Sequence, residues 1–292
     1  MNASDQSVVL GTAQWGLNYG RTNQHGRQLE PDLRALVASA RSAGVQLLDT
    51  AAAYGDSEAR IAVVGAGFSI QTKIAVSGLE ASTMQAQFRD SCLRLARENI
   101  DGLLVHDWDV ADLRSRQQAA EFLMATREMG LVRRVGVSVY SIAELESFVE
   151  VVPELDVVQV PVNLLDQRLD HEPLIAKLRS QGVTIQARSV LLQGLIASPG
   201  SAGVIGNHPD LESLRSVLGV NQPERLRLAL GYVSSRDWVD EIILGVATSI
   251  EFEQLWNAWV ERKVVSDWSV YASDDVNLLD PRLWPPKESL NS

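Results

Sequence analysis

The sequence predicts a single-domain (β/α)8 barrel, because β-like and helical segments alternate along nearly all of its 292 residues. The candidate strands lie within residues 7–13, 45–51, 69–74, 100–107, 132–140, 155–163, 182–190 and 239–247. Such alternation implies parallel strands joined by right-handed crossovers. Eight units favour a closed barrel over an open sheet. No GxGxxG motif follows the first strand, which weakens the alternative of a dinucleotide-binding open sheet.

Helices are predicted between the strands because apolar residues recur there at the helical period. Clear examples are residues 31–44, 81–99 and 111–130. The first of these ends at Gly44, a residue type that commonly terminates helices. No linker, short repeat or low-complexity tract divides the chain, so we expect residues 1–292 to form one domain.

Two segments interrupt the alternation. Residues 191–220 follow the seventh strand and are rich in Gly, Ser and Pro. They predict a long loop with a short helix near residues 209–217, and loops of this length are often functional lids. The tail, from about residue 263 to 292, contains Trp268 and Trp284. We expect its aromatic part to pack on the barrel or its mouth.

The composition, with 46% hydrophobic and 22% charged residues, is ordinary for a globular protein. A formal net charge of -11 argues against a nucleic-acid partner or an anionic membrane, because both repel an acidic surface. The N-terminus lacks a secretory signal pattern, and no apolar run approaches the ~20 residues of a membrane span. With a single cysteine, the chain is expected to be cytoplasmic. The pattern does not predict an oligomeric state.

The single cysteine and three of the four histidines do not indicate a reactive or metal-binding site. Cys92 lies in a helical segment and is interpreted as a small buried thiol. His25, His171 and His208 lie in polar contexts without metal-ligand spacing, so no metal site is predicted.

Four polar residues lie at or just beyond the ends of candidate strands: Asp49, Tyr54, Lys73 and His106. In a β/α barrel, catalytic groups project from the carboxyl ends of the strands. Tyr54 is the candidate proton donor. Its phenol has an ordinary pKa near ~10, which a nearby ammonium would lower. Lys73 can supply that charge, Asp49 can hold Lys73, and His106 can donate a hydrogen bond to a carbonyl oxygen.

Each of these residues also has a structural interpretation when taken alone. Asp49 could cap a turn, Lys73 could be a solvated surface charge, and Tyr54 could serve packing. His106 is flanked by Asp107 and Asp109, so a local ion pair would explain it as well. The joint occurrence at strand ends favours the catalytic interpretation.

With these residues in place, the chain resembles the aldo-keto reductase superfamily. The resemblance lies in GTAQWG, LLDTAAAYGDSE, TK, SCLRLARENIDGLLVHDWD, GVSVYS, VVQVPVNLLD, RSVLLQGL and LGVATS, in family order up to about residue 260. It implies a (β/α)8 barrel that binds a nicotinamide dinucleotide, NAD or NADP, without a Rossmann domain. It further implies that Tyr54 is the general acid, that Lys73 and Asp49 tune it, and that His106 orients the carbonyl.

The resemblance also implies a set of dinucleotide contacts. Ser138 and Gln159 match positions that hold the nicotinamide carboxamide. The whole implied set comprises Trp15, Asp49, Ser138, Gln159, Arg188, Ser189, Leu191, Gln193, Gly194, Gly245, Ala247, Thr248 and Glu251.

Two residues depart from common family choices near the nicotinamide. Val139 stands where an Asn often follows the serine, so one amide contact is absent. Arg188 stands where many members stack a tyrosine on the nicotinamide. Its guanidinium could stack on the ring, although a cation disfavours the positively charged oxidised form. It could instead bind an acidic group of the substrate or pair with a carboxylate.

The segment after the eighth strand bears on the choice between NAD and NADP. Gly245 and a following helix start would make an anion site, yet no Lys or Arg occurs between Asp240 and Trp259. Glu251 would repel a 2′-phosphate and accept from a ribose hydroxyl, which favours NAD. Thr248 and Glu251 also fit a capping box, in which the acid only closes the helix. Both interpretations stay open.

Trp15 and Trp108 both follow barrel strands. By resemblance they line the substrate pocket, and core packing is the alternative.

The leading hypothesis is an NAD(P)-dependent oxidoreductase that interconverts an alcohol and a carbonyl in an aldehyde, ketone or sugar. A second is a cofactor-sensing regulatory protein with little turnover. A third is a lyase or isomerase that uses Lys73 as a Schiff-base amine. The GTAQWGLNYG and RSVLLQGL segments resemble a bacterial branch that is loosely associated with sugars and surface-polysaccharide pathways, so the substrate itself is not predicted.

Overall fold

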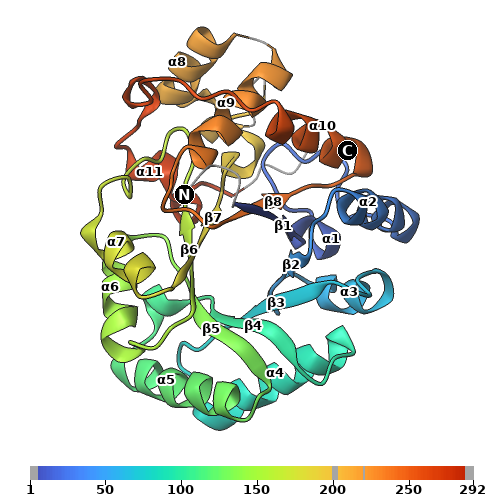
Figure 1. The fold of residues 1–292 in the computed structure, drawn as a ribbon, viewed down its shortest axis with the longest axis vertical. Helices are drawn as coiled ribbons and strands as arrows, with labels where there is room; N and C mark the ends of the chain where they lie inside the picture. Colours follow the sequence, from blue (N-terminus) through green and yellow to red (C-terminus); the bar gives the residue numbers. More distant parts are fainter. Residues whose placement is uncertain (1–5, 199–202, 220, 287–292) are drawn as a thin grey trace.

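The computed structural model describes residues 6–198, 203–219 and 221–286. Eight parallel strands close into a barrel in the order β1 to β8, with β1 paired to β8 (Figure 1). The strands are β1 (Ser7–Gly11), β2 (Leu47–Asp49), β3 (Ser69–Ile74), β4 (Ile100–Val105), β5 (Val132–Ser138), β6 (Val157–Pro161), β7 (Thr184–Arg188) and β8 (Glu241–Gly245). All eight lie inside the predicted segments, and the predicted single-domain barrel is confirmed.

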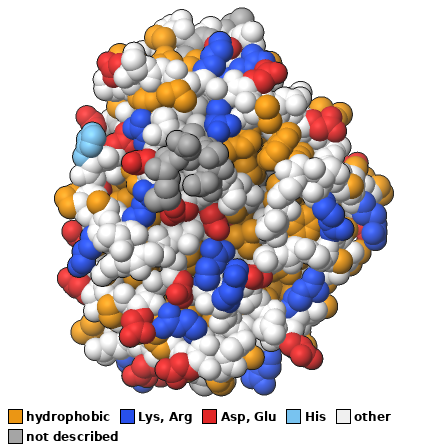
Figure 2. Space-filling model, in the orientation of Figure 1, with side chains coloured by type: hydrophobic (Ala, Val, Ile, Leu, Met, Phe, Trp, Pro, Cys, Tyr) orange, Lys and Arg blue, Asp and Glu red, His pale blue; other side chains and the backbone are white. Residues whose placement is uncertain are grey.

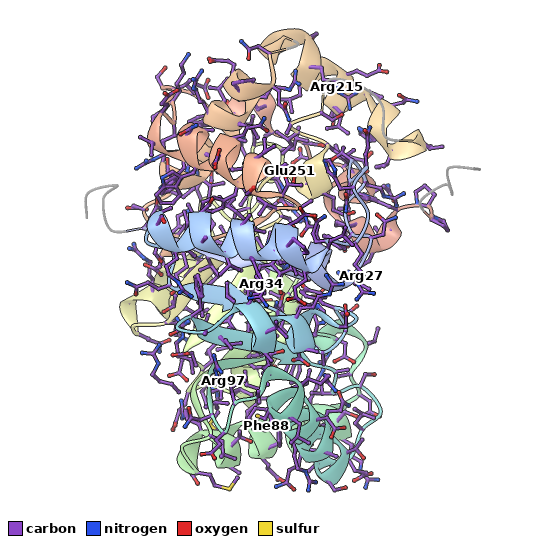
Figure 3. All side chains as sticks on the ribbon, turned by 90° about the vertical axis from the view of Figure 1, so that its right-hand side faces the viewer. Arg27, Arg34, Phe88, Arg97, Arg215 and Glu251 are labelled. Carbon is purple, nitrogen blue, oxygen red and sulfur yellow. The ribbon has the colours of Figure 1, made fainter. Side chains whose placement is uncertain are left out.

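Helices surround the barrel (Figure 1). They are α1 (Ala13–Gly16), α2 (Glu30–Ser42), α3 (Ser57–Val64), α4 (Ala81–Leu95), α5 (Leu113–Glu128), α6 (Ile142–Val151), α7 (Pro173–Ser180), α8 (Pro209–Leu218), α9 (Gln222–Ser234), α10 (Ser249–Val260) and α11 (Val276–Leu279). Short 3-10 turns are η1 (Trp108–Val110), η2 (Leu192–Gly194), η3 (Val204–Asn207), η4 (Ser269–Tyr271) and η5 (Pro281–Leu283). On the flank seen in Figure 3, α2 packs beside α10.

Helix α2 ends as its sequence predicts. Gly44 has a positive φ of 85°, and its N–H donates to the Arg41 carbonyl while the Val45 N–H donates to the Ala40 carbonyl. This pair of bonds satisfies the last carbonyls of the helix and turns the chain towards β2. The buried Leu33, Leu36, Val37 and Ala40 face the barrel, so apolar burial fixes which side of α2 points inward.

The two irregular segments pack on the barrel. The loop after β7 carries η2, η3 and the predicted short helix, found as α8; its residues 199–202 and 220 lie outside the described residues. In the tail, the Trp268 ring packs edge-on against Tyr232, with ring centroids 5.5 Å apart. The Trp284 indole N–H donates to the Leu278 carbonyl at 3.0 Å, and the Arg21 guanidinium lies over its ring. Residues 287–292 lie outside the described residues.

Basic and acidic side chains are interspersed on the face shown in Figure 2, although the chain has an acidic surplus. Among the described residues, no helix is long and apolar enough to cross a membrane.

Candidate active site

The four strand-end residues come together at the carboxyl end of the barrel. Asp49 is the last residue of β2, Lys73 lies one residue before the end of β3, and His106 directly follows β4. The Lys73 ammonium donates to Asp49 Oδ2 at 2.6 Å and to the Thr50 carbonyl at 3.0 Å. The side chains of this ion pair are 1% and 5% exposed. The interpretation of Lys73 as a solvated surface charge is therefore wrong.

Tyr54 stands in the turn after β2 and covers this pair. Its ring lies edge-on to the His106 ring, with centroids 5.8 Å apart. The Lys73 ammonium lies 5.2 Å from the Tyr54 ring centroid. Among the described residues, the ion pairs that include a histidine involve His25 and His208, not His106. The neighbouring Asp107 accepts from the backbone N–H groups of Val76 and Ser77. The local ion pair considered for His106 is therefore not formed.

The YGDSE segment holds this turn against the first strand. The Ser57 hydroxyl donates to the Thr12 hydroxyl and carbonyl, at 2.8 and 3.0 Å. Gly16 packs directly on the turn, because a Cβ there would lie 1.9 Å from the Tyr54 carbonyl oxygen. Any larger residue at position 16 would push the turn away and displace the Tyr54 ring. The motif thus acts by positioning the phenol.

The pKa of Tyr54 is shifted in the opposite direction to the one expected from the sequence. Burial and the negative charge of Asp49 raise the pKa of Tyr54 above its ordinary value, and the Arg188 guanidinium opposes this rise. The expected lowering of the Tyr54 pKa by Lys73 is not found, because Asp49 neutralises the ammonium at 2.6 Å. Burial likewise lowers the pKa of Lys73, against the pull of Asp49. Tyr54 is consequently protonated at neutral pH.

His106 is neutral over the same range. Burial, followed by the positive charges of Lys73 and Arg188, lowers its pKa to about 4. A neutral imidazole carries one N–H donor and one acceptor nitrogen. It can therefore donate a hydrogen bond without adding charge beside Lys73.

The pH dependence of folding should report this shift. Unfolded His106 takes up a proton near pH ~6.5, whereas the folded residue does so near 4. The unfolded chain binds the proton first, so the free energy of unfolding falls as the pH drops through this window, by roughly 2–3 kcal/mol for this one group. Denaturant unfolding of wild type and His106→Gln between about pH 4 and 7 should show a shallower slope in the variant. Equal slopes would contradict the shifted pKa.

A polar network in the barrel interior, not anticipated from the sequence, holds the second oxygen of Asp49. Gln71 and Gln159 both donate to Asp49 Oδ1, at 2.9 and 2.6 Å. Gln71 and Gln186 exchange amide hydrogen bonds at 2.9 and 3.2 Å, and Gln186 donates to Glu241, which pairs with Arg134. Asp49 therefore keeps Oδ2 for Lys73. The three glutamines lie at inward positions of β3, β6 and β7.

The predicted carboxamide residues lie beside this network. The Gln159 amide N–H donates to Asp49, while Gln159 Oε1 is buried without a partner among the described residues. Ser138, at the end of β5, accepts from Arg188 Nε at 3.1 Å. An unpartnered buried acceptor and an adjacent hydroxyl fit an amide group that has both N–H and C=O. The residues present thus fit a nicotinamide carboxamide.

The segment after β7 has strained backbone. Ser189, Leu192 and Gln193 have φ values of 58°, 46° and 54°, a region that residues other than glycine rarely adopt. The Gln193 carbonyl accepts from the Arg21 N–H, which ties the segment to the loop after β1. Such strain commonly marks ligand-binding segments. This agrees with the predicted roles of Leu191 and Gly194 in the same segment, which stay predictions.

The segment after β8 forms the predicted cap. Thr248 Oγ1 accepts from the Glu251 N–H at 3.1 Å, and Glu251 Oε2 accepts from the Ala247 N–H at 2.7 Å. The other oxygen of Glu251 lies 3.7 Å from His25 Nε2. The Gln14 amide lies against Gly245, where a Cβ would be 2.9 Å from Gln14 Oε1. The capping interpretation of Glu251 is realised, and its contact with a ribose stays a prediction.

Both tryptophans predicted to line the pocket are buried. Trp15 is 0% and Trp108 1% exposed. The Trp108 N–H donates to the Ser147 hydroxyl at 2.8 Å and its ring packs on Phe148. The structure shows a packing role for Trp108, and its contact with a substrate stays a prediction. The Trp15 N–H has no partner among the described residues, so its contact with a ligand remains a prediction.

Two tyrosines near the site were missed. Tyr140 lies against Arg188, and Tyr19 lies close enough to Arg188 for the guanidinium charge to act on its phenol. Burial raises the pKa of the Tyr19 phenol, and the Arg188 guanidinium opposes this rise. Both tyrosines belong to loops that only the closed barrel brings together.

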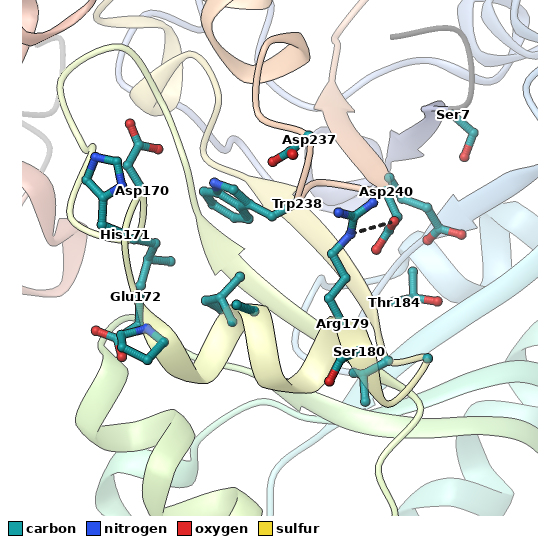
Figure 4. A pocket seen from close by; sticks show the side chains of 17 residues that line it. Ser7, Asp170, His171, Glu172, Arg179, Ser180, Thr184, Asp237, Trp238 and Asp240 are labelled. Carbon is teal, nitrogen blue, oxygen red and sulfur yellow. Dashed lines mark ion pairs between the residues drawn. The ribbon is translucent and has the colours of Figure 1, made fainter. Parts of the chain in front are cut away.

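A separate cavity opens at the opposite end of the barrel (Figure 4). It is lined by Ser7, Thr184 and Glu241, which begin β1, β7 and β8, and by Arg179 and Trp238. The four strand-end residues do not line it. Among the described residues, no group of three or more His, Cys, Asp or Glu side chains could hold a metal ion.

Comparison with known proteins gives the family of the chain. The sequence profile of the Aldo/keto reductase family matches residues 7–273. The chain belongs to the aldo/keto reductase family. An aldo-keto reductase of Mycolicibacterium vanbaalenii is 27% identical over 193 residues, which are 63% of this chain and 67% of the relative. One from Mycobacterium sp. (strain KMS) is 33% identical over 187 residues, 61% of this chain and 66% of the relative.

Solved structures share the fold of this aldo/keto reductase. The holo form of AKR11C1 from Bacillus halodurans has a TM-score of 0.72 at 18% identity, covering 91% of this chain and 90% of its own. The glycerol dehydrogenase AKR11B4 from Gluconobacter oxydans has a TM-score of 0.64 at 18% identity, covering 98% and 95%. The sequence matches span about half to two thirds of the bacterial relatives' length.

Proposed function

We propose that this protein is an NAD(P)-dependent oxidoreductase that interconverts a carbonyl group and an alcohol in a small aldehyde, ketone or sugar. The observation that carries the proposal is the buried Lys73–Asp49 pair beneath Tyr54 and His106. We further propose that residues 1–292 act as one cytoplasmic domain.

The chain's own residues provide proton transfer and polarisation. When bound, the nicotinamide supplies the hydride, which no side chain can provide. Tyr54, protonated at neutral pH, holds the proton that the substrate oxygen takes up as it becomes negatively charged. Neutral His106 donates a hydrogen bond to that oxygen. Lys73 and Asp49 position the Tyr54 ring and neutralise each other's charge.

The dinucleotide is expected to lie across the ends of β5 to β8. Gln159 and Ser138 would hold the carboxamide, on the strength of the unpartnered Gln159 Oε1. The strained 189–194 segment and the start of α10 would hold the phosphates through backbone N–H groups.

We expect NAD to be preferred over NADP. Glu251 is 39% exposed at the start of α10, where its charge would repel a 2′-phosphate. Glu251→Gln keeps the capping hydrogen bond but removes the charge. The variant should raise the NADPH-to-NADH ratio of kcat/KM roughly tenfold, which corresponds to about 1.4 kcal/mol. Steady-state kinetics with both cofactors test this, with thermal unfolding as a check that the cap is intact. Equal or better wild-type efficiency with NADPH would refute the preference.

The activity is tested by following cofactor oxidation against a panel of aldehydes, ketones and sugars. Turnover of at least one carbonyl, and oxidation of the matching alcohol, are the expected results. Tight dinucleotide binding without turnover on any carbonyl or alcohol would favour the cofactor-sensing alternative.

A Schiff-base role for Lys73 is disfavoured because its side chain is 1% exposed and its ammonium is paired with Asp49. Trapping of a substrate on Lys73 by borohydride would reverse that conclusion.

A further inference from the structure

Arg188 is a cation with an unusual environment next to the four strand-end residues. Its charge acts on Tyr54, Lys73 and His106, so it lies close to where a carbonyl would react. Among the ion pairs of the described residues, none includes Arg188. We propose that Arg188 forms a subsite for a negatively charged group of the substrate, a carboxylate or a phosphate. This proposal rests on the proposed function and names its substrate class.

The guanidinium is held in place by uncharged groups. Arg188 Nε donates to the Ser138 hydroxyl at 3.1 Å, Nη1 to the Ser189 hydroxyl at 3.1 Å, and Nη2 to the Val139 carbonyl at 2.7 Å. Its carbon Cζ lies 3.8 Å from the centroid of the Tyr140 ring. The guanidinium is therefore oriented before any ligand arrives, which reduces the entropy cost of binding.

Two donors remain for a ligand. A guanidinium has five N–H groups, and the three hydrogen bonds use one on each nitrogen. One N–H is left on each of Nη1 and Nη2. Two donors on one planar group match the two oxygens of a carboxylate or phosphate. The free donors thus favour an oxyanion over a single hydroxyl.

A neighbouring arginine provides the contrast. Arg282 also stacks on the Tyr140 ring, with Cζ 4.2 Å from its centroid. It pairs with Asp109, Glu144 and Asp280 at 2.7–2.8 Å. Two guanidinium groups therefore share one aromatic ring, and the one nearer the catalytic groups has no carboxylate. In a chain with 37 acidic and 26 basic residues, carboxylates are not scarce.

The energetics favour a charged ligand at this position. A half-buried cation without a carboxylate in direct contact is costly. Asp280 acts on Arg188 without forming an ion pair with it, and the Tyr140 face and three neutral acceptors offset part of the cost. An anion brought by the substrate would supply the missing counterion. Stacking of Arg188 on the nicotinamide would leave the charge uncompensated and would oppose the oxidised cofactor. We therefore assign Arg188 to the substrate rather than to the nicotinamide.

Matched substrates test the proposal. The first pair is 4-carboxybenzaldehyde and 4-methylbenzaldehyde, and the second is glyceraldehyde 3-phosphate and glyceraldehyde. Wild type should prefer one charged member by at least about tenfold in kcat/KM, as expected for hydrogen bonds to a charged group. Arg188→Met should remove that preference, so that the charged-to-neutral ratio of kcat/KM falls to about one whatever the variant's overall turnover. The two pairs separate carboxylate from phosphate recognition.

Two further variants control for charge and packing. Arg34→Met removes the same charge from the exposed face of α2 (Figure 3), where Glu30 is the ion-pair partner of Arg34 among the described residues. This variant should keep the preference. Arg188→Lys keeps the charge but not the paired donors, so it should retain part of the preference for the charged substrate. Dinucleotide affinity, measured by fluorescence quenching, should be unchanged in Arg188→Met.

A binding measurement separates this proposal from the proposed function. Calorimetry with terephthalate and with inorganic phosphate should show binding of one of them to wild type and at least tenfold weaker binding to Arg188→Met, as lost charged hydrogen bonds imply. Arg188-dependent anion binding without turnover of any carbonyl would leave the subsite standing and overturn the function. Equal anion binding by both proteins, or a loss of dinucleotide affinity in Arg188→Met, would overturn the subsite.

Discussion

Tyr54→Phe is expected to lower kcat for carbonyl reduction by roughly 10²–10⁴-fold, the usual contribution of a positioned general acid. The phenol is the one group at the site that is protonated at neutral pH and stands over both Lys73 and His106. Phenylalanine keeps the ring and its edge contact with His106 but lacks the proton. Steady-state kinetics on a substrate found active in the carbonyl panel measure the effect.

The control for this variant is its folding and its cofactor binding. The Tyr54 hydroxyl donates no hydrogen bond to a described residue, so the free energy of unfolding should change by less than about 1 kcal/mol. Dinucleotide affinity should also be unchanged. A Phe variant that keeps wild-type turnover would show that another group delivers the proton.

Lys73→Met is expected to reduce the free energy of unfolding by about 3–5 kcal/mol, because removing one partner leaves a buried charge without compensation. The Asp49 carboxylate would keep only its amide donors, Gln71 and Gln159. Asp49→Asn should have a similar cost at neutral pH, since it strands the Lys73 ammonium. Denaturant unfolding with a constant m-value measures both effects.

The double variant Asp49→Asn/Lys73→Met separates charge pairing from packing. It leaves no uncompensated buried charge, so its loss should be smaller than the sum of the two single losses. The free energy of unfolding of Asp49→Asn should also rise with pH, because a folded lysine with a lowered pKa binds fewer protons than the unfolded one. Strictly additive losses would mean that the pair contributes through packing alone.

The positions of the candidate catalytic residues could be predicted from the sequence because of how a barrel is built. Asp49, Lys73 and His106 end successive apolar segments, and parallel strands place such ends at one rim. Their mutual contacts needed no knowledge of loop conformation. The cap formed by Thr248 and Glu251 was also predictable, since its residues are three apart.

The surroundings of these residues could not be predicted in the same way. Gln71 meets Gln186 across 115 residues of sequence, and Arg188 meets Val139 across 49. Tyr140 receives Arg188 on its ring only because the β5 and β7 loops converge. Inward and outward positions of a strand buried on both faces carry no alternating pattern, so the inward glutamines gave no distinct signal.

The sequence by itself determined the barrel, its closed order and the presence of an acid, a phenol, an amine and an imidazole at one end. Strand periodicity and strand-end position, both local properties of the chain, are sufficient for that. Only the tertiary structure decided the protonation states and the pairing of charges. Burial sets the pKa values of Tyr54 and His106, and contacts distant in sequence leave Arg188 without a carboxylate while Lys73 and Arg282 each have one or more. Burial and long-range pairing arise only when the barrel closes.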